Sequence, residues 1–311
     1  LHRGGALAGR SHRRLRLMAP RSTALVWPDL VWSHFSRPRF GGFDERVAAA
    51  SAAGFKGLGL YVYDYRRMRD EEGRSPAQLS DVLAAHQMVL AEVEVVHGWW
   101  ATSGPQHDAC REMEALAFEM ADEFDIRYLQ VIGGDGYTVA EAVAGFGVLC
   151  DRAADHGLLV GIESLPFTNI PDAAAAQRIV EGADRANGGY CVDIWHHVRG
   201  ANDLGMLQRL GGERVFAIQM SDGPLVQATA ADNPRGDYKT DCLVARVPPG
   251  LGEFDCAGFM RALHEMGVVA PISLEVCSKE LWEAPPAVAA QLAADGMRKV
   301  LKAAGLAGVT T

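Results

Sequence analysis

The sequence lacks the closely spaced cysteine pairs that mark zinc ribbons and redox centres. It has six cysteines, none in CxxC spacing, and most stand inside apolar stretches, where a free cysteine behaves as a small hydrophobic residue. The cysteines are Cys110, Cys150, Cys191, Cys242, Cys256 and Cys277. This usage indicates a reducing compartment, so we expect a cytoplasmic protein.

Long apolar runs are also lacking. No run reaches the roughly 18 to 20 residues that cross a bilayer, so we expect no transmembrane helix and no membrane partner. The first residues are rich in arginine and have no apolar segment, which argues against a secretory signal and leaves a transit peptide as an alternative. We interpret residues 1–20 as a basic extension, either disordered or not native, with Met18 near the natural start. Residues 21–311 are expected to form one catalytic domain.

Positive charge is scarce as well. Lysine and arginine number 30 against 39 aspartate and glutamate residues, which gives a net charge of −9. Binding to nucleic acid needs a basic face, and the only basic cluster lies at the extreme N-terminus. The charge therefore excludes nucleic acid as the expected partner and favours a small-molecule substrate.

What the sequence does contain is a regular alternation of short apolar runs and longer amphipathic ones. The expected strands cover 23–35, 55–63, 89–100, 126–134, 158–164, 188–197, 214–223 and 271–278. The expected helices cover 43–54, 75–87, 107–124, 138–157, 171–183, 203–211, 255–267 and 285–305. Eight such pairs predict a parallel sheet closed into a single (β/α)8 barrel, with an open doubly wound sheet as the alternative. Closure is favoured because no strand is followed by G-x-G-x-x-G or a P-loop.

Polar residues stand where four neighbouring strands end, the place where barrels build their sites. Glu163, Asp193 and Glu275 each follow an apolar run, while the seventh strand offers Gln219 within it and Asp222 just after it. A buried carboxylate is costly unless it is paired or binds a metal, and no basic residue adjoins these acids in sequence. The oxygen-rich set predicts one hard divalent ion, Mn²⁺ or Mg²⁺, with a buried ion pair or a solvated loop acid as the alternative for each residue.

Five segments carry a resemblance to a known family. They read "GIES", "CVDIWH", "IQMSDG", "RVPPGLGEFD" and "SLEV", and they span about residues 158–276. In order and spacing they resemble the xylose isomerase-like TIM barrels of the sugar phosphate isomerase/epimerase superfamily. The alternation of strands and helices extends the resemblance to about residues 24–303.

The resemblance implies a single divalent metal ion held by Glu163, Asp193, Gln219 and Glu275. It also implies that the two glutamates exchange protons with a substrate carbon next to a carbonyl, which is chemistry that a metal ion and a carboxylate can share. The seventh-strand ligand is commonly a histidine in the ketose epimerases, so Gln219 is a departure that leaves the reaction type open.

Further residues take roles from the same resemblance. His196 is implied to contact a substrate oxygen and Arg246 to reach over the pocket to the substrate. We expect His197 to be structural, since neighbours on a strand point to opposite faces. A histidine ligand at position 196 would shift the metal preference away from Mn²⁺ and Mg²⁺.

The segment after the third strand is a second candidate for substrate binding. His97, Trp99 and Trp100 would form an apolar wall and a second acid or base for a bulky substrate, with buried packing as the alternative for the tryptophans. The long connection from Gly223 to Val247 is expected to be a lid or a subunit contact.

The function expected from these features is isomerisation or epimerisation through removal of a proton next to the carbonyl of a sugar, keto-sugar or polyol-derived substrate. The alternative is a lyase or dehydratase that uses the same deprotonation for β-elimination of an inosose, a dehydroshikimate-like acid or a 3-keto-glycoside. A second alternative is a barrel that has lost catalysis and acts as a binding subunit. A homo-oligomer is expected by analogy alone.

Overall fold

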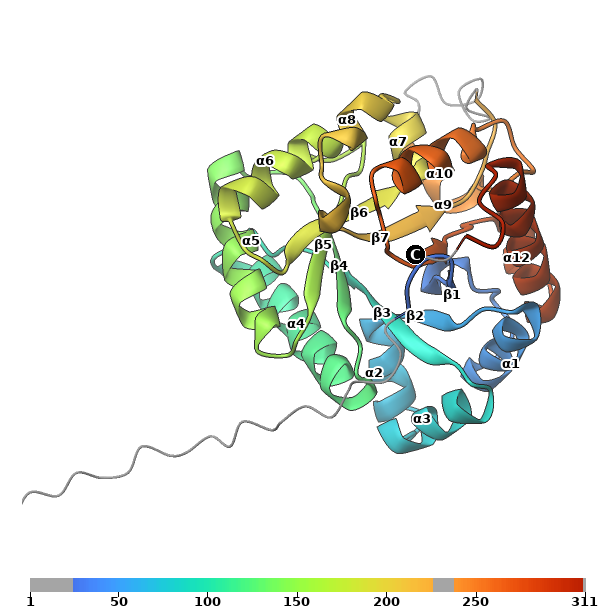
Figure 1. The fold of residues 1–311 in the computed structure, drawn as a ribbon. Helices are drawn as coiled ribbons and strands as arrows, with labels where there is room; N and C mark the ends of the chain where they lie inside the picture. Colours follow the sequence, from blue (N-terminus) through green and yellow to red (C-terminus); the bar gives the residue numbers. More distant parts are fainter. Residues whose placement is uncertain (1–24, 226–237, 310–311) are drawn as a thin grey trace, which may run out of the picture.

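The protein, described by a computed structural model over residues 25–225 and 238–309, is a closed barrel of eight parallel strands. Each strand pairs with the next along the chain, and the eighth pairs with the first (Figure 1). The prediction of a single (β/α)8 barrel is confirmed. The strands are β1 Leu30–Trp32, β2 Gly57–Tyr61, β3 Val89–Val96, β4 Tyr128–Ile132, β5 Leu159–Glu163, β6 Gly188–Asp193, β7 Val215–Met220 and β8 Ile272–Leu274.

The helices connect successive strands and surround the barrel (Figure 1). They are α1 Phe43–Ala53, α2 Val62–Asp70, α3 Pro76–Ala85, α4 Gly104–Phe124, α5 Val139–Ala154, α6 Ala173–Ala183, α7 Ile194–Arg199, α8 Leu204–Gln208, α9 Tyr238–Val244, α10 Cys256–Glu265, α11 Lys279–Trp282 and α12 Pro286–Ala303. Two short 3-10 helices, η1 His34–Ser36 and η2 Gly212–Arg214, follow β1 and precede β7. In the part of the chain that is described, no helix has the length and apolar character needed to cross a membrane.

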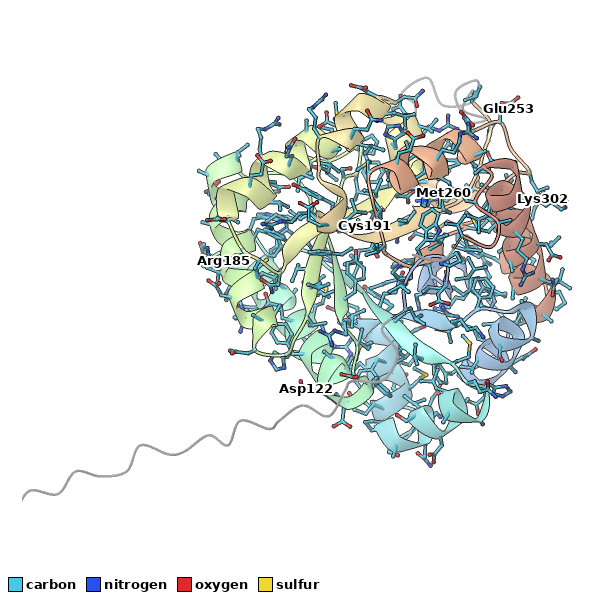
Figure 2. All side chains as sticks on the ribbon, viewed as in Figure 1. Asp122, Arg185, Cys191, Glu253, Met260 and Lys302 are labelled. Carbon is cyan, nitrogen blue, oxygen red and sulfur yellow. The ribbon has the colours of Figure 1, made fainter. Side chains whose placement is uncertain are left out.

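The strands are buried on both faces, as parallel barrel strands must be when helices cover the outside. All six residues of β6 are buried, including Cys191, which lies near the middle of the barrel in Figure 2. Apolar side chains fill most of this interior, so the few buried acids and amides on the strands stand out as exceptions. The buried acids and amides show where the candidate site lies.

Local chemistry accounts for a difference from the expected boundaries. The strand expected over residues 188–197 ends at Asp193, because the Asp193 side chain accepts a hydrogen bond from the backbone N–H of Trp195 and so caps α7. His196 and His197 therefore lie on a helix, and the expectation that both lie on a strand is wrong.

Other expectations fall partly or wholly outside the described residues. The basic extension over residues 1–20 lies outside them, so its interpretation stays a prediction. Of the long connection between β7 and α10, the described part contains α9, while residues 226–237 lie outside. Asp222 and Val247 form an antiparallel bridge that closes the base of this connection.

Candidate active site

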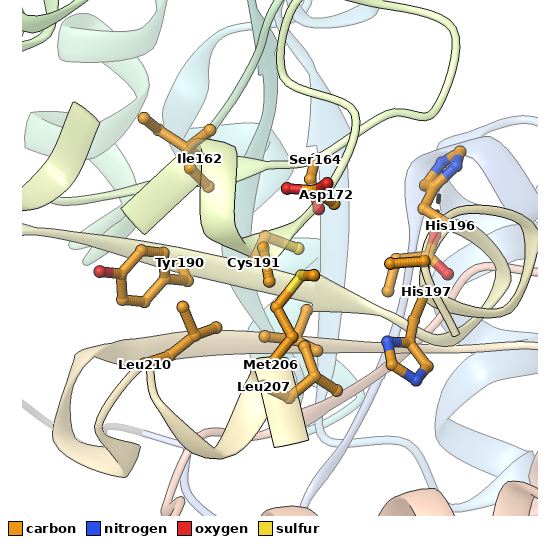
Figure 3. A pocket seen from close by; sticks show the side chains of 15 residues that line it. Ile162, Ser164, Asp172, Tyr190, Cys191, His196, His197, Met206, Leu207 and Leu210 are labelled. Carbon is orange, nitrogen blue, oxygen red and sulfur yellow. Dashed lines mark ion pairs between the residues drawn. The ribbon is translucent and has the colours of Figure 1, made fainter. Parts of the chain in front are cut away.

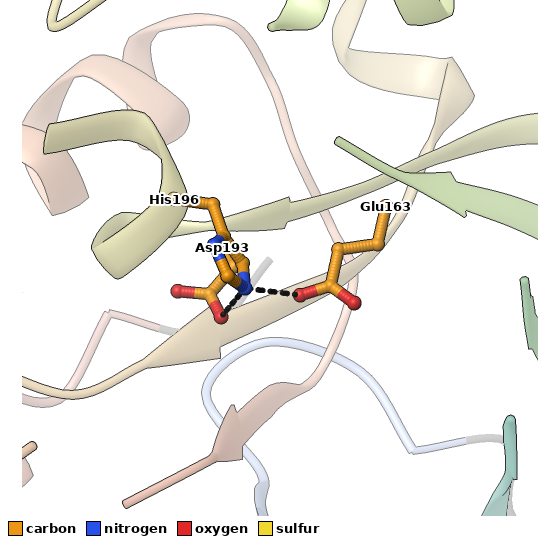
Figure 4. Close-up of side chains that lie close together, drawn as sticks. All are labelled: Glu163, Asp193 and His196. Atoms are coloured by element: carbon orange, nitrogen blue, oxygen red, sulfur yellow. Dashed lines mark ion pairs between the residues drawn. The ribbon is translucent and has the colours of Figure 1, made fainter. Parts of the chain in front are cut away.

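Three carboxylates converge at the carboxyl ends of the strands. Glu163 ends β5, Asp193 ends β6, and Glu275 directly follows β8. They are 4%, 3% and 5% exposed, so none of the three is a solvated loop acid. The parallel pairing of β5 with β6 brings the first two side chains to the same end of the barrel (Figure 4).

His196 lies between two of these carboxylates. Its Nε2 is 3.3 Å from Oε1 of Glu163 and 3.7 Å from Oδ2 of Asp193 (Figure 4). Each of the three side chains offers a metal-ligating atom, and these atoms lie within 4.8 Å of one another. The structure thus joins His196 to the two strand-end acids through the first turn of α7.

Arg246 is the cation of this cluster. Its Nη1 donates to Oδ2 of Asp193 at 2.7 Å and to Oε2 of Glu275 at 3.1 Å, and its Nη2 is 3.2 Å from Nε2 of His196. The side chain is 1% exposed, so it lies among the acids, deeper than the position over the pocket that we expected. Arg246 therefore forms ion pairs with two of the three carboxylates, those of Asp193 and Glu275.

The charges of the cluster set the protonation of its members. Burial raises the pKa of Glu275 well above its ordinary value, and the Arg246 guanidinium opposes this only in part. Burial also acts on Asp193, but the charges of Arg246 and His196 outweigh it and hold the pKa of that carboxyl below its ordinary value. Although burial would lower it, the pKa of His196 is raised well above its ordinary value by Cys242 and Asp193.

Gln219 is connected to the cluster through a residue that the sequence did not single out. Its Nε2 donates to Oε1 of Gln130 at 3.2 Å, and its Oε1 accepts from the thiol of Cys191 at 3.2 Å. Gln130 in turn donates through Nε2 to Oε2 of Glu163 at 2.7 Å. The sequence signal for Gln130 is an amide inside the otherwise apolar strand β4.

Cys242 is a second member that sequence reasoning missed. It lies on α9, and its Sγ is 3.8 Å from Nε2 of His196 and 3.4 Å from Nη2 of Arg246. Against the effect of burial, Arg246 and His196 lower the pKa of the Cys242 thiol. Arg246 follows four residues later, just beyond the end of α9 at Val244, and the sequence alone did not show that a helix would bring the two side chains together.

Glu94 on β3 is a buried acid just inside the barrel. Its carboxylate accepts from Oγ of Ser33 at 2.9 Å and from the backbone N–H of His34 at 3.0 Å. Gly59 makes room for it, since a Cβ at that position would lie 1.6 Å from Oε1 of Glu94. Burial raises the pKa of Glu94 to about 7.

Asp222 has structural hydrogen-bond partners, and His197 packs against Phe259. Both oxygens of Asp222 accept backbone hydrogen bonds, from Gly223 at 2.7 Å, Phe254 at 2.9 Å and Gly250 at 2.9 Å, so this acid organises the loop after β7. His197 points away from His196 into a cavity of about 20 Å³ beside α8 (Figure 3).

The residues expected to form an apolar wall after β3 have different surroundings. Trp99 donates through Nε1 to the carbonyl of Ile132 at 2.8 Å and packs edge-on against Trp100 and Phe146, so it belongs to the core. His97 is exposed. The structure thus supplies a packing reason for Trp99 and leaves His97 as the accessible side chain of this segment.

The cluster fits a divalent ion. Oε1 of Glu163 is buried and has no hydrogen-bond partner within residues 25–225 and 238–309, although it faces Nε2 of His196. A buried carboxylate oxygen needs a cation or a proton donor, and both His196, whose pKa is raised, and a divalent ion can serve here. Carboxylate, amide and imidazole donors are all known ligands of divalent metals.

Comparison with known proteins agrees with this architecture. Residues 47–305 match the family described as "Xylose isomerase-like TIM barrel", and the chain belongs to that family.

Among the curated relatives, the chain is 28% identical over 275 residues to the 3-dehydroshikimate dehydratase of Pseudomonas aeruginosa, an alignment that covers 84% of this chain and 40% of that protein. It is also 28% identical over 138 residues to the inosose isomerase of Bacillus subtilis, covering 43% of this chain and 46% of that protein. The chain therefore aligns with less than half the length of either relative.

Solved structures show the same fold. A protein solved with a bound zinc atom superposes with a TM-score of 0.77 at 18% identity, covering 88% of this chain and 98% of that one. A fusion of a xylose isomerase-like barrel with a 4-hydroxyphenylpyruvate dioxygenase superposes with a TM-score of 0.76 at 21% identity, covering 89% of this chain and 43% of the fusion.

Proposed function

We propose that this chain is a divalent-metal-dependent enzyme that removes a proton next to a carbonyl in a small, hydroxylated, sugar-like substrate. The observation that carries the proposal is the buried cluster in which His196 lies 3.3 Å from Glu163 and Arg246 lies 2.7 Å from Asp193. Such convergence of strand-end acids, a histidine and an arginine is far denser than packing requires. It also argues against a barrel that has lost catalysis.

We propose that Glu163, Asp193, Gln219 and Glu275 hold the ion, with Mn²⁺ or Mg²⁺ preferred by their oxygen atoms. Ligation by His196 would shift the preference towards zinc, the metal present in one structural neighbour. When bound, the ion polarises a substrate carbonyl and so acidifies the neighbouring C–H bond.

The protein groups supply the proton transfers. Glu163 is the proposed base, because Gln130 anchors its Oε2 and leaves Oε1 to accept a proton. Glu275 is the proposed partner in proton transfer, since it follows β8 at the same end of the barrel and shares Arg246 with Asp193. His196 and Arg246 are proposed to donate hydrogen bonds to substrate oxygens, with His97 as a further substrate-side residue; Trp99, expected in that role, packs in the core instead.

We infer that dehydration follows deprotonation. The alignment with 3-dehydroshikimate dehydratases extends over 84% of the chain. A dehydratase also needs a proton donor for the leaving hydroxyl close to the base, and His196 lies beside Glu163 in this way. Isomerisation or epimerisation is the second candidate, favoured by the inosose isomerase match and by the same first step.

A panel assay in D₂O distinguishes the two outcomes. The metal-loaded protein is incubated with 3-dehydroshikimate, inososes, ketoses and 3-keto-glycosides, and products are followed by NMR. Loss of water or aglycone supports elimination, whereas deuterium at one carbon of an intact skeleton supports isomerisation. If none of the substrates shows either elimination or deuterium incorporation, the proposal of α-deprotonation is contradicted.

We further infer a small-molecule partner and no nucleic acid, because the net charge of −9 disfavours a phosphate-binding face. A cytoplasmic location is proposed from the six free, buried cysteines, and a homo-oligomer from analogy.

A further inference from the structure

A second cavity lies at the opposite end of the barrel from the candidate active site. Its volume is about 200 Å³, and its walls come from the beginnings of the strands, with Glu92 from β3, Tyr128 from β4, Ala217 from β7 and Ser273 from β8. The candidate active site uses the ends of the same strands, so the two sites lie at opposite ends of the barrel. We call this cavity the lower chamber.

Unpartnered polar atoms converge on the lower chamber. Both carboxyl oxygens of Glu92, Oη of Tyr128 and Oγ of Ser273 are buried and lack a hydrogen bond of good geometry among the described residues, although Ser273 lies close enough to Glu92, and Cys191 to Tyr128, to affect their pKa values. The side chains are 3%, 7% and 2% exposed. A buried polar group without a full set of partners costs up to about 1 to 3 kcal/mol, so three poorly satisfied side chains around one cavity favour a bound molecule.

The charge of the chamber selects the kind of molecule. Burial raises the pKa of Glu92 to about 8, with the charges of Glu94 and Glu163 adding to this and Ser273 opposing it. The two named charges that act on Glu92 are therefore both negative. Arg127 stands with Asp125 at the mouth, and both are exposed. Near neutral pH this pKa leaves Glu92 largely protonated; a bound cation would favour its carboxylate form, whereas the negative charges of Glu94 and Glu163 disfavour an anion.

The rest of the lining is apolar and leaves room. Leu90, Leu159, Phe216 and Pro271 contribute side chains to the wall. Gly161 helps to keep the space around Tyr128 open, because a Cβ at that position would lie 2.8 Å from Oη. A mostly apolar cavity with a few convergent polar groups is typical of a small-molecule site.

We propose that the lower chamber binds a small organic cation, with an ammonium or amidinium head held by Glu92, Tyr128 and Ser273 and an apolar body against the surrounding wall. The four oxygens of these three side chains match the N–H donors of such a head. A hard metal ion fits less well, since it takes about six or more oxygen ligands and gains nothing from an apolar wall.

The test is calorimetric titration of the full chain with benzamidinium, with neutral benzamide as the isosteric control. We expect saturable binding of benzamidinium, and Glu92→Gln should weaken it by at least about tenfold, which corresponds to roughly 1.4 kcal/mol. Ser273→Ala should weaken it by a smaller factor. Because the carboxylates at the other end of the barrel also attract cations, Asp193→Asn is measured in parallel and should bind benzamidinium as the wild type does.

Several results would overturn the proposal. They are absence of saturable binding by the wild type, equal binding of benzamide, unchanged binding by Glu92→Gln, or loss of binding by Asp193→Asn. Circular dichroism establishes that each variant is folded, and Ser273→Ala together with Tyr128→Phe keeps the test decisive if Glu92→Gln does not fold. Failure here leaves the proposed enzymatic function untouched, since Glu92 has no part in it.

Discussion

The side-chain amide of Gln130 donates a 2.7 Å hydrogen bond to Oε2 of Glu163, inside the barrel where both side chains are buried. The same amide accepts from Nε2 of Gln219 through its oxygen. Gln130 thereby fixes which oxygen of Glu163 is anchored and which faces His196. It is a positioning residue: it acts on the chemistry through Glu163.

Replacement of Gln130 tests this role. Gln130→Leu leaves Oε2 of Glu163 and Nε2 of Gln219 without partners, so we expect the free energy of unfolding to fall by about 1 to 3 kcal/mol. We also expect kcat to fall by about tenfold or more, with a smaller change in KM, because the base is misplaced and not removed. Equal changes in kcat for Gln130→Leu and for Gln177→Leu, at a partly buried glutamine on α6, would contradict the positioning role.

Loss of either proposed proton-transfer carboxylate should abolish turnover. Glu163→Gln and Glu275→Gln keep the size of the side chain but remove its ability to exchange a proton, so we expect kcat to fall by at least about a thousandfold. Steady-state assays on the substrate found in the panel provide the measurement. Glu265→Gln, at an exposed acid on α10, is the matched control. Near-normal turnover by Glu275→Gln would refute its assignment.

His197 should matter for acid stability and little for turnover. Burial lowers its pKa from 6.5 to about 4, and its Nε2 has no partner in the described part of the chain. In the unfolded chain His197 takes up a proton below about pH 6.5, whereas in the folded chain it does so only below about pH 4. The unfolded state therefore gains stability relative to the folded state as the pH falls from about 6.5 to about 4.

The corresponding variant is His197→Gln. Its free energy of unfolding should fall less between pH 7 and pH 4 than that of the wild type, by up to about 3 kcal/mol. Urea titrations at several pH values measure the difference, and kcat at neutral pH should stay near the wild-type value. A parallel pH dependence in both proteins would show that His197 does not titrate in this way.

Arg246 and a bound cation should substitute for each other in part. Arg246→Met leaves Asp193 and Glu275 without their guanidinium, and breaking a buried pair in this way costs about 3 to 5 kcal/mol. A divalent ion would offset part of this loss. We therefore expect Arg246→Met to be strongly destabilised in EDTA and partly rescued by Mn²⁺, as measured by thermal unfolding. An identical destabilisation with and without Mn²⁺ would count against a cation at these carboxylates.

The sequence predicted the barrel and its strand-end acids because both follow from local pattern. Parallel strands must bury both faces, so Glu163 and Asp193 stood out against apolar neighbours, and barrel closure brought them to one end. The start of α7 was missed because Asp193 was interpreted only as a strand residue, although an aspartate is also a strong helix cap.

Contacts between distant segments could not be predicted. Cys242 and Arg246 contact His196 although they lie 46 and 50 positions after it in the sequence. Gln130 meets Gln219 across 89 positions. Only the closed fold brings these side chains together, so the depth of Arg246 and the amide pair that anchors Glu163 became visible in the structure alone.

The metal content of the purified protein tests the central claim most directly. The wild-type chain and Asp193→Asn are equilibrated with Mn²⁺, dialysed in parallel and measured by inductively coupled plasma mass spectrometry. We predict a single tightly held divalent ion per wild-type chain and a large loss of that ion in Asp193→Asn, which lacks one of the converging carboxylates. A wild-type chain that retains no divalent ion, or a variant that retains as much as the wild type, would contradict the account.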